Sequence, residues 1–151
     1  MTLQETVEIP ISSFGQFFRE AGEDAVVLPH CLDCDRHHWY PMERCPHCFS
    51  ERLEWASVSG HATVYSVTTV RFAFTAATRG QTPYGIALVT FDDAPDVRMV
   101  CRTNASEKGS DVAIGDAVMV SVTTDATDPD TGMVSCTPLA SDAESGEHGE
   151  R

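Results

Sequence analysis

Two closely spaced pairs of cysteines constrain this chain more than any other feature of its sequence. Cys31 and Cys34 form one C-x2-C pair, Cys45 and Cys48 form a second, and ten residues separate the pairs. Each pair can form a tight turn that directs two sulfur atoms at one ion, and two such turns together supply four tetrahedral ligands. A site of this kind has no open coordination position for a substrate. The spacing therefore predicts one structural zinc ion per chain, with iron in the same ligand set or two disulfides as the alternatives.

Four histidines flank these cysteines, and all of them could be mistaken for metal ligands. They are His30, His37, His38 and His47. Because four cysteines already complete a tetrahedral site, we expect each histidine to be exposed or to lie around the ligands. The ring of His47, inside the second pair, is expected to face solvent.

The N-terminal residues and the lack of long apolar runs indicate the cellular compartment of the protein. Residues 1–10 are polar and acidic, without the apolar core of a secretory signal, and no apolar run approaches the length of about 20 residues that a membrane helix needs. We therefore expect a cytoplasmic protein in a reducing compartment, where disulfides are disfavoured.

Cys101 and Cys136 fall within predicted strands and are interpreted as small buried hydrophobic residues.

Composition and charge exclude several classes of function. The chain has 151 residues, of which 42% are hydrophobic and 22% charged, values typical of one globular domain or two very small ones. Ten Lys and Arg against 23 Asp and Glu give a formal net charge of −13. This acidity disfavours binding to nucleic acid or to an anionic membrane. No phosphate-binding glycine loop, nucleophile elbow or zinc-protease motif occurs, and we predict no catalytic residue.

The second half of the chain has the pattern of a small β domain. Short runs rich in β-branched residues alternate with turn signals, which predicts a small antiparallel barrel or sandwich. The expected strands are residues 53–58, 61–70, 84–91, 97–102, 117–124 and 132–137. The turn containing Asp92, Asp93 and Asp96 is expected to be solvated. Residues 71–83 and 103–115 are long connections, and loops of this length in a small domain are often functional.

A short amphipathic helix is predicted near the N-terminus. Ser12 or Ser13 can cap it, Gly22 can end it, and Phe14, Phe17 and Phe18 recur at helical spacing. This aromatic stripe either covers the core of this chain or docks on a partner. The domain organisation that follows is 1–24 leader and helix, 25–56 metal-binding ribbon, 57–139 β domain and 140–151 disordered acidic tail.

A cysteine ribbon followed by a small barrel, in this order, resembles a family of acyl-CoA-associated proteins with a rubredoxin-like zinc ribbon and a C-terminal OB-fold. The matching pieces run from the aromatic helix to residue 138. They are the two C-x2-C pairs, Trp39-Tyr40-Pro41, Leu53-Glu54-Trp55, Ser59-Gly60, residues 63–66, Pro83-Tyr84, residues 87–89 and residues 114–118. The resemblance implies a mainly β chain: an N-terminal helix, the zinc ribbon and an antiparallel OB-fold barrel.

One departure from the family pattern concerns the residue after each C-x2-C pair. The family usually places glycine there, whereas this chain has Asp35 and Phe49. Phenylalanine adopts a positive φ poorly, so we expect the second cysteine turn to be distorted.

The function that the resemblance implies is accessory rather than catalytic. Members of this family are small subunits of thiolase-like or hydratase-like enzymes, and the partner carries the nucleophile and the bases. The chain would then be inactive alone and would form a hetero-oligomer with a thiolase-like catalytic subunit, for which an acyl-CoA thioester is the substrate. The alternatives are a subunit of an enoyl-CoA hydratase-type complex, an OB-fold that binds single-stranded nucleic acid, and a small iron redox protein.

Within this interpretation, two groups of residues are candidate contacts. In the connection 71–83, Arg71 and Arg79 could meet phosphates, while Phe72 and Phe74 could line an apolar channel for the acyl-CoA or meet the partner. The alternative is that both rings pack inside the barrel. The second group is the aromatic stripe Phe14, Phe17 and Phe18, as a helix that docks on the partner.

Overall fold

The computed structural model describes residues 14–21 and 25–139. The leader before residue 14 and the acidic tail 140–151 lie outside these described residues, so the disorder predicted for the tail stays a prediction. The described part is mainly β, with one short N-terminal helix, α1 (Phe14–Glu20), as predicted. No helix in residues 14–21 and 25–139 is long and apolar enough to cross a membrane.

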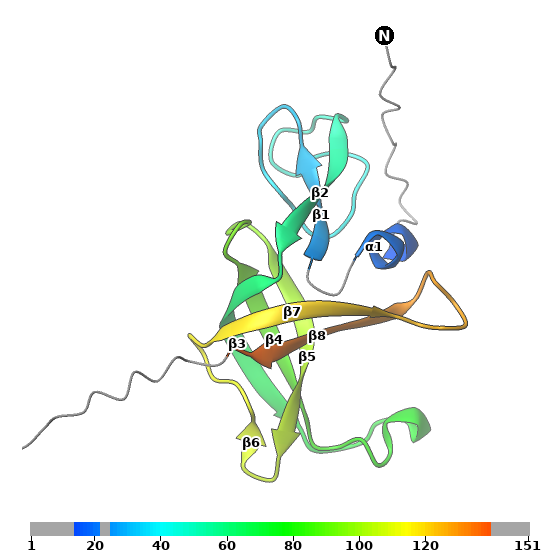
Figure 1. Ribbon diagram of the computed structural model, residues 1–151, viewed down its shortest axis with the longest axis vertical. Coiled ribbons are helices and arrows are strands. Elements are labelled where there is room, and N and C mark those ends of the chain that lie inside the picture. The colour runs from blue at the N-terminus through cyan, green and yellow to red at the C-terminus, as the bar shows by residue number, and fades with distance from the viewer. Residues whose placement is uncertain (1–13, 22–24, 140–151) are drawn as a thin grey trace, which may run out of the picture.

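The ribbon is built on a two-stranded antiparallel sheet at the top of Figure 1. Strand β1 (Ala25–Cys31) pairs with β2 (Leu53–Ser59), in a register that runs from Ala25 opposite Ser59 to Cys31 opposite Leu53. The segment between these strands carries the remaining cysteines. Strand β2 extends to Ser59, so the boundary predicted between residues 56 and 57 falls within this strand. Only Gly60 separates β2 from the next strand, which begins at His61.

The remaining strands close into a barrel, which decides between the barrel and the sandwich predicted from the sequence. They are β3 (His61–Val70), β4 (Tyr84–Phe91), β5 (Arg98–Ser106), β6 (Gly109–Ser110), β7 (Ala117–Thr124) and β8 (Gly132–Pro138). The sheet order is β4-β3-β7-β8-β5-β6, and an additional pairing of β4 with β5 closes the ring. All of these pairings are antiparallel except the short contact of β5 with β8.

Strands β3, β4 and β7 have the bounds that the sequence predicts, whereas β2, β5 and β8 end later than predicted and β1 was not among the expected strands. The largest difference is in β5, which continues to Ser106 and turns into the short strand β6; the end of β5 and all of β6 lie within 103–115, the segment expected to be a polar connection. The hairpin between them includes Gly109 at a φ of 121°, a conformation that favours glycine. The polar composition of this hairpin hides it from a search for hydrophobic alternation.

Alternating side chains build the core of the barrel. In β4, the buried Gly85, Ala87, Val89 and Phe91 alternate with half-buried residues, as expected for a strand with one face inside. Cys101 and Cys136 are both buried in this core, in agreement with their interpretation as small hydrophobic residues. Where β2 passes into β3, a Cβ on Gly60 would lie 2.5 Å from the carbonyl oxygen of Val120, so only glycine fits there.

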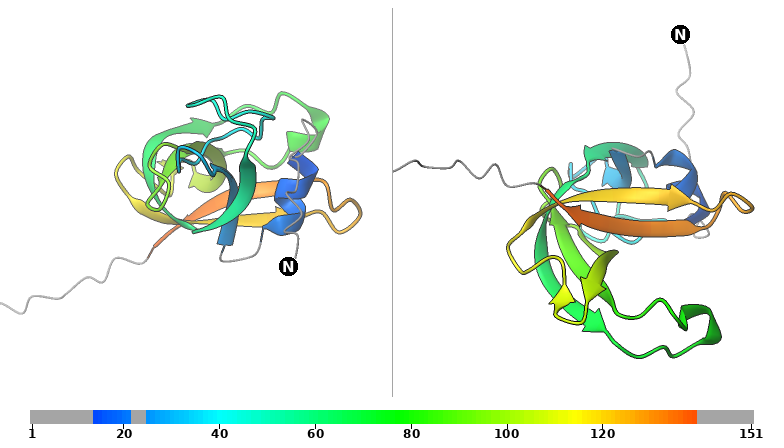
Figure 2. Two further views of the ribbon diagram at one scale, coloured as in Figure 1. Left: turned by 90° about the horizontal axis from the view of Figure 1, so that it is seen from above. Right: turned by 60° about the horizontal axis from the view of Figure 1, so that its bottom comes forward.

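The aromatic face of α1 covers the core of this chain. The ring of Phe17 is fully buried, with its centroid 4.8 Å from that of Trp39, and Phe18 packs against the same core. The hydroxyl of Thr124 donates a hydrogen bond to the carbonyl oxygen of Phe18, and Arg19 forms an ion pair with Asp130. The helix therefore lies between the ribbon and the β7–β8 hairpin (Figures 1 and 2).

This packing corrects part of the docking hypothesis for the aromatic stripe. Phe17 and Phe18 pack in the core of this chain and are not available to a partner. This packing stabilises α1, since a helix this short is not stable without tertiary contacts. Phe14 alone of the three keeps a large exposed surface, and its ring also contacts Trp39 and Tyr40.

Candidate metal centre

The two C-x2-C pairs fold into turns with matching hydrogen bonds. In the first turn, the amide of Cys31 donates to the carbonyl oxygen of Arg36 at 2.9 Å, and the amide of Asp35 donates to that of Cys31 at 3.0 Å. The second turn repeats this pattern: the amide of Cys45 donates to Ser50, and that of Phe49 donates to Cys45. Two equivalent turns therefore face one another from opposite sides of the ribbon.

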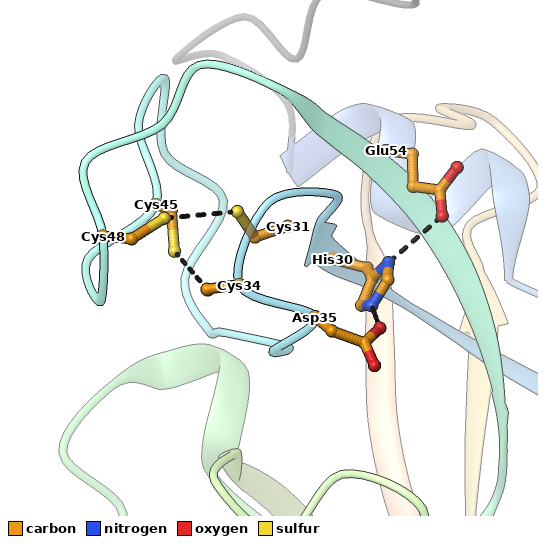
Figure 3. Close-up of polar contacts among 7 residues, drawn as sticks. All are labelled: His30, Cys31, Cys34, Asp35, Cys45, Cys48 and Glu54. Carbon is orange, nitrogen blue, oxygen red and sulfur yellow. Dashed lines mark hydrogen bonds and ion pairs between the residues drawn. The ribbon is translucent and has the colours of Figure 1, made fainter.

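These turns bring together the four sulfur atoms that the spacing predicts (Figure 3). The sulfurs of Cys31, Cys34, Cys45 and Cys48 all lie within 4.8 Å of one another. The Cys31–Cys48 and Cys34–Cys45 sulfur distances are 3.5 and 3.6 Å. Disulfide sulfurs lie about 2.05 Å apart, so neither pair is bonded. Tetrahedral zinc with Zn–S bonds of about 2.3 Å separates its sulfurs by about 3.8 Å, so the cluster fits this ion.

The four thiols of the cluster influence one another's ionisation. Burial and hydrogen bonds with the neighbouring thiols raise the pKa of Cys34 to about 12, while burial is outweighed at Cys31 by hydrogen bonds from backbone amides and neighbouring thiols, which lower its pKa to about 7. Four thiolates this close would repel one another, and a divalent cation at their centre removes that repulsion. Leu53 and Trp55 pack against the buried Cys31 and Cys45.

Asp35 and Phe49 occupy the position that follows each pair, and both adopt a positive φ, of 58° and 63°. The distortion expected for the second turn is therefore absent, because Phe49 takes the same left-handed conformation as Asp35. Its ring is 71% exposed, so little side-chain packing offsets the unfavourable backbone conformation.

The histidines around the cluster differ in their surroundings. The ring of His30 contacts two carboxylates, with Nε2 2.8 Å from Asp35 Oδ1 and Nδ1 3.1 Å from Glu54 Oε1 (Figure 3). His47 is exposed, as predicted. His38, by contrast, is buried. Its side chain is 3% exposed, and no described residue is a hydrogen-bond partner of either ring nitrogen.

The burial of His38 follows from extended backbone that the sequence did not indicate. His37 forms an isolated bridge with His30, and the amide of His38 donates to the carbonyl oxygen of Pro29. Successive side chains on extended backbone point to opposite sides, so His37 faces His30 while His38 points into the protein. Burial lowers the pKa of His38 to about 4, which keeps its ring neutral near pH 7.

Sequence reasoning missed the contacts that join the ribbon to the barrel. Asp96 accepts two hydrogen bonds from Arg36, and Asp93 accepts one from the amide of Ser59. The turn is exposed to solvent, as predicted, and it also binds the ribbon through two of its carboxylates. A cavity of about 350 Å³ lies at this junction, lined by His30, Asp35, Arg36, His37 and residues 93–96.

The connection 71–83 extends from the end of the barrel opposite the ribbon (Figures 1 and 2). Phe72 and Phe74 are 70% and 81% exposed, with ring centroids 5.3 Å apart, so the alternative in which they pack inside the barrel is wrong. Arg71 donates from Nη1 to the carbonyl oxygen of Glu107 and ties this loop to the β5–β6 hairpin. The loop thus carries two exposed apolar rings and, elsewhere along it, two cations, Arg71 and Arg79.

A four-cysteine ribbon joined to a closed antiparallel barrel defines a zinc-ribbon and OB-fold protein. Residues 19–54 match the family model described as "ChsH2, rubredoxin-like zinc ribbon domain", and residues 55–123 match "ChsH2, C-terminal OB-fold domain". The chain belongs to this ChsH2/DUF35 family.

One solved structure shares the fold over almost the whole chain, and a second is a weaker match. The structure described as "Ltp2-ChsH2(DUF35) aldolase" has a chain that is 20% identical, with a TM-score of 0.62 over 91% of this chain and 98% of that one. A DUF35 protein of unknown function from Sulfolobus solfataricus is 21% identical over 72% of this chain and 74% of that one, with a TM-score of 0.44. No functionally curated protein matches the chain.

Proposed function

We propose that this chain is a non-catalytic accessory subunit of a thiolase-type complex that cleaves or forms a C–C bond on an acyl-CoA thioester. The observation that carries the proposal is the likeness to a DUF35 chain of the Ltp2-ChsH2 aldolase, which spans almost the whole length of both chains. Membership of the same family supports it. The catalytic subunit would supply the nucleophile and bases, and this chain would stabilise it and shape the acyl-CoA channel.

In this proposal the metal has a structural role. Cys31, Cys34, Cys45 and Cys48 would hold one zinc ion, which cross-links the two turns and has no position left for a substrate. The ribbon contains few large apolar residues, so its fold would depend on this cross-link. The ribbon in turn holds Arg36 against the barrel, and so fixes the two parts of the accessory subunit relative to one another.

The loop 71–83 would contact acyl-CoA or the entrance to the active site of the partner. Phe72 and Phe74 offer apolar surface to an acyl or pantetheine chain, and Arg71 and Arg79 offer charge to phosphate oxygens. A Phe72→Ser/Phe74→Ser double variant of the reconstituted complex should raise KM for acyl-CoA at least tenfold, whereas Met133→Ser on β8 should leave it unchanged. An unchanged KM in the double variant would remove the loop from the proposal.

The experiment that tests the function is co-purification of the tagged full chain from its native host at low salt, followed by mass spectrometry. We expect a thiolase-like subunit in stoichiometric amount, and acyl-CoA cleavage only when both subunits are present. A hydratase-like subunit in its place would favour the hydratase-type complex. Recovery of the chain without a partner, or turnover of acyl-CoA by the zinc-loaded chain alone, would overturn the proposal.

A further inference from the structure

Acidic residues are unevenly distributed along this strongly acidic chain. It contains 23 Asp and Glu, yet residues 61–91 and 97–106 contain none. These two segments include all of β3, β4 and β5, together with Arg71, Arg79, Arg98 and Arg102. The barrel therefore has one region of positive charge in a molecule with a formal net charge of −13.

Strand register gathers part of this region on a single outer surface. The pairs Ser66–Leu88 and Leu88–Val100 form one row across β3, β4 and β5, and the neighbouring row of Val67, Ala87 and Cys101 faces the core. We define the acid-free face as the outward residues of these strands. They are Tyr65, Ser66, Thr68, Ile86, Leu88, Arg98, Val100 and Arg102.

The acid-free face is apolar at its centre and open to solvent. Val100 is 51% exposed and Tyr65 is 50% exposed, while Ile86 and Leu88 are half-buried between them. The described helix α1 packs against β1 and β7 instead, on another side of the barrel. A contiguous apolar surface with a charged border is typical of a protein interface.

Two arginines border this surface in fixed positions. The guanidinium of Arg98 lies 3.9 Å from the ring centroid of Tyr65. Tyr65 is the extra residue of a β-bulge between Val64 and Ser66, so it has no partner residue in the pairing of β3 with β4. The guanidinium of Arg102 lies 4.3 Å from the ring centroid of Tyr84 and donates from Nη1 to Gln81 Oε1 at 3.0 Å. Within residues 14–21 and 25–139, neither guanidinium forms an ion pair with a carboxylate.

We propose that the acid-free face docks the catalytic subunit, through a surface of that subunit that carries carboxylates opposite Arg98 and Arg102 around an apolar centre. This inference rests on the proposed function. Charge complementarity supports it, because the remainder of this acidic chain would repel an acidic partner and this face would attract one. The aromatic contacts hold both arginines in place before binding, which lowers the entropic cost of forming the ion pairs.

Other occupants of the face fit less well. A second copy of the face would offer Arg98 and Arg102 no carboxylate, since the residues that define the face include none, so a contact between two copies would leave both guanidinium groups without an ion-pair partner. Single-stranded nucleic acid needs free aromatic rings for base stacking, whereas Tyr65 and Tyr84 already lie under guanidinium groups.

The test uses the full zinc-loaded chain and the catalytic subunit purified by co-purification. Two variants alter the face: Val100→Asp places a charge at its apolar centre, and Arg98→Glu reverses one bordering charge. Two controls match them elsewhere: Met133→Asp on β8, where Met133 is 46% exposed, and Arg44→Glu on the ribbon. Zinc content and circular dichroism identify any variant that fails to fold, and Val100→Ser and Arg98→Gln then replace it.

We expect each face variant to weaken binding of the catalytic subunit at least tenfold, and each control to change it less than twofold. Tight binding by either face variant overturns the inference and leaves the proposed function intact, since the partner still binds. Equal weakening by the controls also overturns it, because the effect would then not be specific to this face. If the unmodified chain binds no catalytic subunit, or if it binds a single-stranded oligonucleotide that Arg98→Glu does not, the proposed function and this inference both fail.

Discussion

Arg36 in the ribbon and Asp96 in the turn between β4 and β5 form a bidentate ion pair. Nε of Arg36 donates to Oδ2 of Asp96 and Nη2 donates to Oδ1, both at 3.0 Å. The two residues are 60 positions apart, and the contact joins the metal-binding ribbon to the barrel. Two parallel hydrogen bonds fix the relative orientation of the groups as well as their distance.

We predict that Arg36 and Asp96 stabilise the protein as a coupled pair. Arg36→Ala and Asp96→Ala should each lower the urea midpoint slightly, and the double variant should be no less stable than either single variant. Arg44→Ala combined with Asp96→Ala is the control, and its effects should add because Arg44 pairs with Glu51 instead. Additive effects for Arg36 and Asp96 would contradict the coupling.

The pH dependence of this ion pair follows from the pKa of Asp96. Hydrogen bonds from Arg36 hold that pKa below its ordinary value of 3.8. A carboxylate with a lowered pKa in the folded state contributes its stability above the ordinary value and loses it as pH falls through the folded value. The coupling should therefore be unchanged between pH 8 and pH 5 and decline only below about pH 4.

The four-cysteine site predicts a metal requirement that can be measured directly. Replacing Cys45 with Ser should reduce the zinc content from one equivalent per chain to none and unfold the ribbon, because its few apolar residues cannot maintain the fold alone. Elemental analysis of protein purified without chelator measures this. Cys101→Ala in the barrel should retain the full equivalent. Wild-type protein that contains neither zinc nor iron would refute the assignment.

Phe49 predicts a stabilising substitution. Phe49→Gly should raise the free energy of unfolding by about 1 kcal/mol, since glycine relieves a left-handed conformation that costs about 1–2 kcal/mol and loses about 0.5–1 kcal/mol in backbone entropy. Urea unfolding with saturating zinc measures the change. Asp35→Gly is the matched control in the first turn. It should bring no gain, because aspartate tolerates this conformation and Asp35 contacts His30. A loss of stability in Phe49→Gly would contradict the argument.

His38 predicts a pH-dependent component of stability. Burial lowers the pKa of this residue to about 4 from an ordinary value of 6.5. Between pH 4 and pH 6.5, His38 is therefore protonated in the unfolded chain and neutral in the folded chain. The contribution is complete above pH 6.5 and is lost progressively as pH falls towards 4, by up to about 3 kcal/mol. At pH 5.5 the expected loss is about 1 kcal/mol relative to pH 7.5.

The variant that checks this component is His38→Leu, measured by urea unfolding at both pH values with saturating zinc. It should lose about 1 kcal/mol less stability between pH 7.5 and pH 5.5 than the unmodified protein does. His61→Leu serves as the control, since His61 is exposed. An identical pH dependence in His38→Leu and the unmodified protein would show that the residue does not carry the effect.

Much of the fold could be predicted because the relevant signals are local. The spacing of Cys31, Cys34, Cys45 and Cys48 indicates the four-sulfur cluster, since each turn needs only the residues between its two cysteines. The runs 61–70, 84–91 and 117–124 indicate strands with the observed bounds. Closure of these strands into a barrel depends on the pairing of β4 with β5 and the short contact of β5 with β8, which no local pattern specifies.

The candidate sites also combine features that the sequence shows with features that only the folded chain shows. The absence of acidic residues from 61–91 is a property of the sequence, but only the register of three strands places Leu88 and Val100 in one outward row. Likewise, the sequence places His37 and His38 beside the cysteines, while the bridge from His30 to His37 decides which of them is buried.

The sequence by itself determined the metal ligands, the positions of most strands and the uneven distribution of charge. Tertiary structure alone decided that α1 covers the core with Phe17, that Arg36 meets Asp96, and that Leu88 and Val100 share one outward row of the barrel. The physical reason is the range of the interactions. Turn geometry and strand alternation act between neighbours in the chain, whereas burial and ion pairing act between surfaces that only the folded chain brings together.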